Sequence, residues 1–496
     1  MLSGCAVGPD FVKPPPPPVN GYTRTGAGID AGNQPKTHFI QDLDIPGQWW
    51  GIYHSAALNR LIEDAMAHNA DLQAAQAALR VARENAAAQR GGFYPQLSGS
   101  FSGIGGDAGS EASSPLANNA PNYTLLTPQV AVSYTPDVFG LVRRENENLD
   151  ALAEVQSYKL EATYLTLTSN VVTSAVQEAA LRGQIKATKE IIKISQANLG
   201  VLRQQRDHGQ IGPSDVLLQE AALAQVEQTL PPLERQLAQQ RNLLTALAGR
   251  FPSDEIGETF TIASLHLPAT LPVSLPSQLV EQRPDIKAAE ANLHAASADV
   301  GVATALRLPL VSLTAGYGNA AERLATMFAP QTIAWQVGGS VTQPMFDGFS
   351  LYHKQKAAQA AFAQADAQYR STVITAFQNV ADVLRALEAD ARTYKAASAA
   401  ETAAFKSLDI TRKQLSAGQV SSIVLLNAQQ TYLQASLVRV QAQAARLADT
   451  AALFQALGGG WWNRGDVSPQ TVADGPKSVK DYFVPKPPDF RSDTPR

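Results

Sequence analysis

The chain has 496 residues, of which 45% are hydrophobic and only 17% charged, and its formal net charge is -4. Such a chain can bury a large core, but it lacks the basic excess that a nucleic-acid-binding surface needs. Its single cysteine excludes an internal disulfide. No run of about 18 apolar residues predicts a membrane-spanning helix, so entry into a bilayer would require another kind of structure.

The first feature along the chain is a short motif around this cysteine. Residues 2–5 read Leu-Ser-Gly-Cys, which resembles the lipobox of bacterial lipoproteins, whose cysteine becomes a lipidated N-terminus. We therefore expect a covalent lipid on Cys5 and no other cofactor, with a chance match as the alternative. No apolar signal-peptide segment precedes the motif, so we expect the precursor to begin further upstream. The prolines at 14–18 predict a stiff tether from the membrane to the body.

Helical and strand periods then alternate over residues 57–250. Apolar residues at helical spacing end at Gly91-Gly92, and larger residues next alternate with small polar ones on both sides of a loop rich in Gly, Ser and Asn. Gly209, Gly212 and Pro213 interrupt the helical pattern that follows. The predicted elements are a helix over 57–90, strands over 94–104 and 124–135, a long helix over 140–208 and a helix over 214–248.

The same order recurs after a linker at 251–275 that is rich in Pro and Thr. The segment from Asp71 parallels the segment from Asp285, and the segment from Pro95 parallels that from Pro309, both 214 positions later. Residues 276–460 are therefore predicted to be a second copy of the unit, followed by a terminal segment at 461–496. Its predicted elements are a helix over 276–306, strands over 307–318 and 331–343, a long helix over 348–417 and a helix over 421–457.

The second long helix is predicted with the clearest signal. No proline or glycine lies between Gly348 and Gly418, and apolar or small residues recur there at steps of four and three. At 1.5 Å per residue such a helix would be about 100 Å long. A helix of this length would bridge a gap or line a tube.

The predicted strands have the length of tilted strands that cross a membrane, about 10 residues each. Four strands cannot close a barrel, and open sheet edges cannot face lipid because their N–H and C=O groups would stay unpaired. Three chains would supply about 12 strands, an ordinary number for an outer-membrane barrel. The expected fold is therefore mainly α with a β-barrel contribution: a trimeric 12-stranded transmembrane barrel on top of a long α-barrel.

Several motifs resemble the outer membrane factors, the TolC-like family, and most closely its NodT-type lipoprotein branch. The most specific motif is Glu-Gln-Arg-Pro-Asp-Ile at 281–286, while Phe349 departs from the second glycine that many members have. The resemblance spans nearly the whole chain. Its other motifs are residues 5–10, Trp49-Trp50 with Leu58, Leu61 and Ile62, residues 69–72, residues 288–290, Pro344 with 346–348, and residues 457–461.

The resemblance implies a duct without a chemical step, and thus no enzyme. Three subunits would form the exit channel of a tripartite efflux or type I secretion system, lipid-anchored in the outer membrane of a Gram-negative bacterium and extending into the periplasm. Residues 1–56, 251–275 and 461–496 would contribute to an equatorial belt. The implied partners are two further copies of the chain, outer-membrane lipid, a periplasmic adaptor (membrane fusion protein) and an inner-membrane pump, either of the resistance-nodulation-division type or driven by ATP; no nucleic acid and no metal are implied.

The resemblance also assigns roles at the two helical turns. The turns would dock the adaptor hairpins, through Gly209, Ile211, Gly212, Pro213 and Ser214 in the first copy and Gly418, Val420, Ser421 and Ser422 in the second. Their alternative role is turn formation alone. Relatives close the tube beyond the second turn, often with an aspartate where this chain has Asn427. We hypothesise a gate closed by packing of Ile423 and Leu426 and by amide contacts of Asn427 and Gln430. Burial of Asn427 between helices is the alternative.

Enzyme and scaffold interpretations explain less of the sequence. The seven histidines show no metal-ligand spacing, and the glycines at 103–106 run from a strand into a loop instead of a helix. A soluble periplasmic coiled-coil scaffold would account for the long helices. It would not require two hairpins with one apolar face each.

Overall fold

The computed structural model of this chain describes residues 6–19, 21–22, 38–41, 44–109, 120–267, 270–273 and 276–465. These residues are mainly helical and include one four-stranded and one two-stranded sheet. They form two compact units, each of which draws on both sequence copies. The first comprises residues up to 14, 78–156 and 288–370; the second comprises 15–77, 157–287 and the chain from 371 onward.

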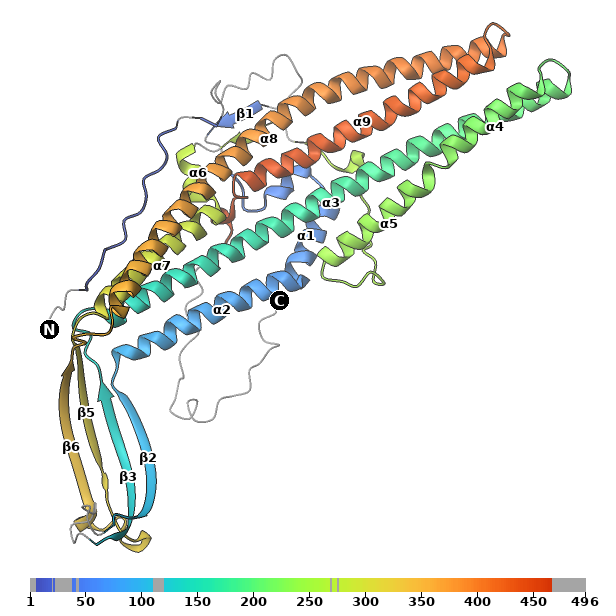
Figure 1. The fold of residues 1–496 in the computed structure, drawn as a ribbon. Coiled ribbons are helices and arrows are strands. Elements are labelled where there is room, and N and C mark those ends of the chain that lie inside the picture. The colour runs from blue at the N-terminus through green and yellow to red at the C-terminus, as the bar shows by residue number, and fades with distance from the viewer. Residues whose placement is uncertain are drawn as a thin grey trace. The chain divides into compact units, whose positions relative to one another are not determined.

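The two sequence copies contain the same order of elements, except that the last helix is divided into two in the first copy (Figure 1). The first copy consists of α1 (Ala56–His68), α2 (Ala70–Arg90), β2 (Gln96–Asp107), β3 (Asn122–Tyr134), α3 (Leu141–Asp207), α4 (Pro213–Glu227) and α5 (Leu230–Leu247). The second consists of α6 (Pro276–Gln282), α7 (Pro284–Ala305), β5 (Leu310–Asn319), β6 (Ile333–Thr342), α8 (Ser350–Ser416) and α9 (Ser422–Ala456). Both long helices, α3 and α8, begin and end within two residues of the predicted ranges. Among the described residues, no helix has the length and apolar character that crossing a membrane would require.

Three helices predicted to be continuous are broken, so those predictions were wrong. The helix predicted over 57–90 is interrupted at Asn69, whose backbone is extended with ψ of 124°. The helix predicted over 276–306 is interrupted at Arg283, because Pro284 disfavours helical backbone in the residue before it. The helix predicted over 214–248 ends at Glu227 and restarts at Leu230, since the prolines in the first turn of α5 have no N–H to continue the bonding of α4.

The four-stranded sheet belongs to the first unit and has the order β2-β3-β5-β6 with every neighbour antiparallel. Each copy contributes one hairpin. The hairpins join through β3 and β5, from the pair of Gln129 with Gly318 to the pair of Tyr134 with Leu313. The two copies therefore form one continuous sheet.

The second unit contains α4, α5, α9 and the parts of α3 and α8 after residues 156 and 370. Arg203 of α3 pairs with Glu220 of α4 at 2.7 Å. In the second copy, the rings of Phe405 on α8 and Tyr432 on α9 lie at a tilt with centroids 5.5 Å apart, and Glu401 forms an ion pair with Arg439. Each long helix is thus held against the helix that returns along it.

A small parallel sheet, not predicted from the sequence, joins two segments that we expected to be equatorial. Strand β1 (His38–Gln41) pairs with β4 (Thr270–Val273), from the N-terminal segment and from the linker between the copies. The two strands are more than 200 residues apart in sequence, and each has only four residues. Such short runs carry too little periodicity to be recognised.

The breaks between helices have a structural role that the two copies share. At the first break, the Asn69 side chain accepts a hydrogen bond from the Leu72 amide and donates one to the Leu247 carbonyl at the end of α5, both 3.1 Å long. At the second break, Arg283 donates to the Ala456 carbonyl at the end of α9 over 3.0 Å. In each copy, the residue between the first two helices therefore caps the last helix.

Two substitutions of Asn69 separate its two bonds. Asn69→Ser keeps an oxygen for the Leu72 amide but cannot reach Leu247, whereas Asn69→Ala loses both bonds. We expect alanine to lower the free energy of unfolding by about 1 kcal/mol for the lost cap and by about 1 kcal/mol more for the lost hydrogen bond. Serine should show only the second loss. Denaturant titration followed by circular dichroism measures both, and equal losses would contradict the cap on α2.

Candidate channel elements

The four strands present one apolar and one polar face. Side chains alternate between faces along a strand, and the register aligns apolar positions across the whole sheet: Val130 is opposite Tyr317, which is opposite Trp335. The apolar face carries Leu97, Phe101, Val130, Val132, Leu313, Tyr317, Trp335, Val337 and Val341, and the other carries Ser98, Ser100, Gln129, Ser133, Ser312, Thr314, Gln336 and Ser340. The predicted one-sided hairpins are therefore confirmed.

The apolar face is uncovered in the chain, and so are the sheet's two edges. Trp335 is 73% exposed and Val337 is 76% exposed. Strands β2 and β6 are the outer strands, each paired on one side only within the part of the chain that the structure describes. A row of unpaired backbone groups can pair with a further strand, and a large exposed apolar surface marks a site of contact with protein or membrane.

The two helical turns have the same backbone geometry. Gly209 and Gly418 both adopt a left-handed conformation with φ of 70°. In the first turn the Gln210 amide donates to the Gln205 carbonyl, and in the second the Gln419 amide donates to the Gln414 carbonyl, both over 2.9 Å. These bonds close the helix ends in the Schellman manner, which explains why glycine stands at both positions.

The structure brings the predicted turn residues into one neighbourhood. The Ser422 hydroxyl donates to the Asp215 carboxylate over 3.2 Å and so links the first turn of α9 to that of α4. Ile211 packs on a buried cluster formed by Leu199, Leu202 and Val216. The remaining turn residues are exposed or half-buried; they are Gly209, Gly212, Pro213, Ser214, Gly418, Val420 and Ser421.

Exposed apolar side chains follow each turn. Val216 and Leu425 occupy corresponding positions and are both buried. Leu217 and Leu218, by contrast, are 62% and 43% exposed, and Ile423 and Val424 are 50% and 42% exposed. After each turn, therefore, one apolar residue packs within the chain, and two neighbouring ones are exposed and available to a partner.

The gate candidates lie on one short stretch of α9. Ile423, Asn427 and Gln430 are exposed, and Leu426 is half-buried. Gln430 lines a groove of about 490 Å³ between α8 and α9, together with Ala397, Ala400, Gln434 and Val438. Asn427 is thus exposed in the single chain and is not covered by a neighbouring helix.

Sequence reasoning missed a buried polar link beside these candidates. Ser195 of α3 donates to the Gln429 side chain on α9, and its carbonyl accepts from Gln219 on α4, both over 3.5 Å. All three residues are at most 3% exposed. Glutamines recur throughout these helices, so no sequence signal separates these two from the exposed ones.

A carboxylate pair lies between α8 and α9, next to Arg446, whose guanidinium lies over the Tyr394 ring at 5.1 Å. Burial, a hydrogen bond with Asp449 and the negative charge of Asp449 raise the pKa of Asp390 to about 6, and Arg446 opposes this shift. The two carboxyl groups share a proton more readily than they both ionise.

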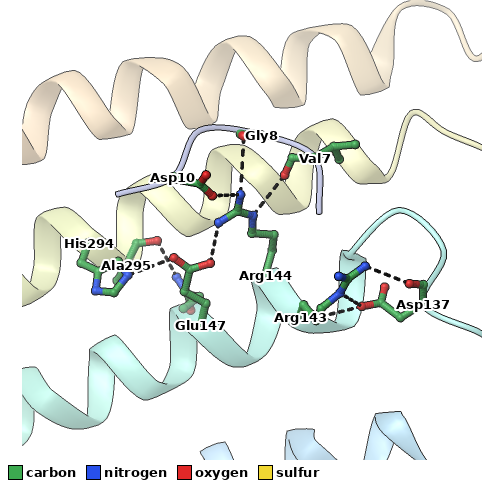
Figure 2. A network of polar contacts seen from close by, with 10 residues as sticks. Val7, Gly8, Asp10, Asp137, Arg143, Arg144, Glu147, His294 and Ala295 are labelled. Carbon is green, nitrogen blue, oxygen red and sulfur yellow. Dashed lines mark hydrogen bonds and ion pairs between the residues drawn. The ribbon is translucent and has the colours of Figure 1, made fainter. Parts of the chain in front are cut away.

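The N-terminal segment before the proline run is docked on the first unit. Figure 2 shows Arg144 of α3 at the centre of these contacts. Its guanidinium donates to the Val7 carbonyl over 3.1 Å and pairs with Asp10 at 2.8 Å and with Glu147 at 2.7 Å. The side chain is only 5% exposed. Cys5, the predicted lipidation site, lies outside the described residues.

Further contacts fix the same segment on α7. Phe11 stacks on His294, with ring centroids 4.4 Å apart, and His294 lies 3.0 Å from Glu147. A side chain on Gly8 would collide with the backbone of Gly301. Residues 7–13 therefore follow a defined track over α3 and α7, which we call the N-terminal strap.

These features define the class of the protein. A sheet with an apolar face and open edges, combined with two hairpins built on helices of 67 residues, provides the parts of a membrane channel subunit. Residues 61–250 and 275–459 match the family described as outer membrane efflux protein. The chain belongs to this family.

Relatives and solved structures match this chain over nearly its full length. The toluene efflux pump outer membrane protein TtgC of Pseudomonas putida is 26% identical over 96% of this chain and 97% of its own. The probable outer membrane lipoprotein SilC of Salmonella typhimurium is 27% identical over 93% and 97%. The structure of the outer-membrane channel OprN superposes with a TM-score of 0.83 at 26% identity, covering 92% of this chain and all of that one. The protein is thus an outer membrane efflux protein, and the soluble-scaffold alternative is set aside.

The Asp390 carboxyl predicts a dependence of stability on pH. Its pKa in the folded state is about 6, above the ordinary 3.8. The protonated carboxyl therefore adds to the free energy of unfolding below about pH 4, and this addition is lost as the pH rises through about 6. Asp390→Asn should raise the thermal unfolding midpoint at a pH of about 7.5 and flatten its decline between about pH 4 and 6. Asp366→Asn, which removes an ion pair with Arg370 within α8, is the matched control. An unchanged pH profile in Asp390→Asn would contradict the shared proton.

Proposed function

We propose that three copies of the chain assemble into one duct. Three sheets of four strands give 12 strands, and closure would pair every β2 edge with a β6 edge of the next copy. The apolar face would then contact lipid and the polar face would line the pore. The single observation that supports this most strongly is the alignment of that apolar face across all four strands.

The helices would continue the pore into the periplasm. We propose that the two turns receive a periplasmic adaptor, which would couple the duct to an inner-membrane pump. Exposed Leu217, Leu218, Ile423 and Val424 support this role because they leave apolar surface on both hairpins beside the turns. TtgC is named as the outer membrane protein of an efflux pump, which supports a duct that works with a separate pump here.

The gate is assigned to α9. Ile423 and Leu426 would close the pore by packing, and Asn427 and Gln430 by amide contacts across the three copies. Amide side chains carry no charge, so this constriction would select ions weakly. Opening would require α9 to move relative to neighbouring helices, and the long, weak bonds of Ser195 to Gln219 and Gln429 are suited to such a movement.

We further propose that Cys5 carries a lipid; the relative SilC is named a probable outer membrane lipoprotein, which supports this. The duct would need no other cofactor and would perform no chemical step, as in a passive channel. Substrates would pass from the pump through the gate and leave through the barrel.

The trimer is tested by native mass spectrometry of protein extracted from outer membranes. The expected mass is close to three times the chain mass of 52.8 kDa. Introducing Val130→Asp on the apolar face should reduce the recovered trimer, because a charge on a lipid-facing strand is destabilising. Ser100→Asp on the polar face is the control. Recovery of an intact monomer from the membrane would contradict closure by three copies.

The gate assignment is tested by conductance through planar bilayers. Asn427→Asp would place three carboxylates around the constriction and should increase selectivity for cations over anions. Leu218→Asp, at the corresponding position of the first copy, adds the same charge on α4 and serves as control. Identical ion selectivity of the wild type and Asn427→Asp would show that residue 427 does not face the pore.

A further inference from the structure

An apolar hollow of about 210 Å³ lies where the helices of the first unit meet the sheet. Its volume is several times the roughly 30 Å³ that one water molecule takes. Two chain corners form its walls, the connection from β3 to α3 and the connection from α7 to β5. The apolar side chains that line it include Phe139, Leu141 and Val142 from the first corner and Leu306, Leu308 and Pro309 from the second.

The charged residue in the wall of the hollow is directed elsewhere. Asp137 accepts hydrogen bonds from the amides of Val142 and Arg143 over 3.1 and 3.0 Å, and its carboxylate also pairs with the Arg143 guanidinium at 3.0 Å (Figure 2). These bonds cap the start of α3 and neutralise the carboxylate. The hollow is therefore suited to an uncharged, apolar occupant.

The N-terminal strap runs directly to this hollow. The Val7 amide donates to the Phe139 carbonyl over 3.1 Å. A side chain on Gly140 would meet Ala6 Cα at 2.6 Å, so Ala6 lies against the backbone between Phe139 and Leu141. One peptide unit, about 3.8 Å between Cα atoms, separates Ala6 from Cys5. Cys5 directly precedes Ala6 in the sequence, so a group attached to Cys5 is tethered one residue away from this contact.

We propose that the hollow binds an acyl chain carried by Cys5. This inference rests on the lipidation proposed above and adds a protein site for the lipid. Arg144 holds the strap through the Val7 carbonyl and Asp10, and Phe11 holds it through His294. A chain tethered this close to the hollow would enter it intramolecularly, at an effective concentration set by the short link. The strap and the hollow together would fix the lipid at the base of the sheet.

The test uses a photoactivatable palmitate analogue supplied to cells that express the full-length gene. Outer membranes are irradiated, and crosslinked peptides of the chain are mapped by mass spectrometry. The expected crosslinks are intramolecular and concentrated at residues 138–142 and 305–310. Leu308→Trp, which fills the hollow, should reduce them several-fold while the label on Cys5 is retained; Leu218→Trp on α4 should leave them unchanged.

A second pair of variants tests the strap. Arg144→Met should lower the same crosslinks, because the strap loses its central cation, whereas Arg90→Met removes only an exposed ion pair with Asp150 and should not. If Leu308→Trp fails to assemble, the crosslinks of the wild type and of the Arg144→Met and Arg90→Met variants still test whether the hollow binds the acyl chain. Labelled Cys5 with crosslinks only to phospholipid, or spread along the strands, would overturn the hollow as the acyl site. Absence of label on Cys5 would overturn the lipidation itself.

Discussion

The hydrogen-bonding capacity of two backbone edges determines how this protein can exist in a membrane. Strands β2 and β6 each present a row of N–H and C=O groups with a partner on one side only among the described residues. In water such edges are tolerable, but in hydrocarbon each unpaired group costs several kcal/mol. The apolar face extends over all four strands, including the edge strands β2 and β6. When this face contacts lipid, both edges therefore lie in hydrocarbon as well. In a membrane, the sheet of a single chain would therefore need further strands to pair with the free edges of β2 and β6.

The duplicated unit supplies a second constraint, which acts on the helices. Each copy ends in a helix whose terminal carbonyl is capped by the residue between the first two helices of that copy. Asn69 performs this in the first copy and Arg283 in the second, although their side chains differ in length and charge. Glycines with positive φ, Gly249 and Gly458, allow the backbones to approach closely at the same places. The motif at 281–286 is thus explained by packing, since Arg283 and Pro284 create both the break and the cap.

The sequence predicted the regular parts of the fold well and the interruptions poorly. Helices α3 and α8 were predicted closely because no proline or glycine interrupts their apolar seams, and the strands because their alternation is strict. The break at Arg283 has a local signal in Pro284, which the prediction of a continuous helix did not use. The break at Asn69 has no such signal, and its side chain bonds to Leu247, more than 170 residues away. Strands β1 and β4 likewise exist through their mutual pairing. No local pattern records such partners, whereas the glycines of the two turns signal a local conformation and were recognised.

The same distinction applies to the functional elements. The turns were located from glycine and proline alone, but the burial of Ile211, the link between Asp215 and Ser422, and the polar contacts of Ser195 arise only when α3, α4 and α9 are packed. Asp390 gave no sequence signal either, since its raised pKa comes from burial and from Asp449 on another helix.

The N-terminal strap depends on contacts that no local pattern records. Prolines 14–18 predict a stiff spacer, but the sequence before that run gives no sign of a docked segment. These residues make a buried cationic contact at Arg144, a ring stack at His294 and a backbone contact at Gly301. A guanidinium that is 5% exposed would lose three of its acceptors if the strap were released, and a buried charge without partners is strongly destabilising. The strap is consequently part of the folded body of the first unit, fixed there by charge, ring and backbone contacts at once.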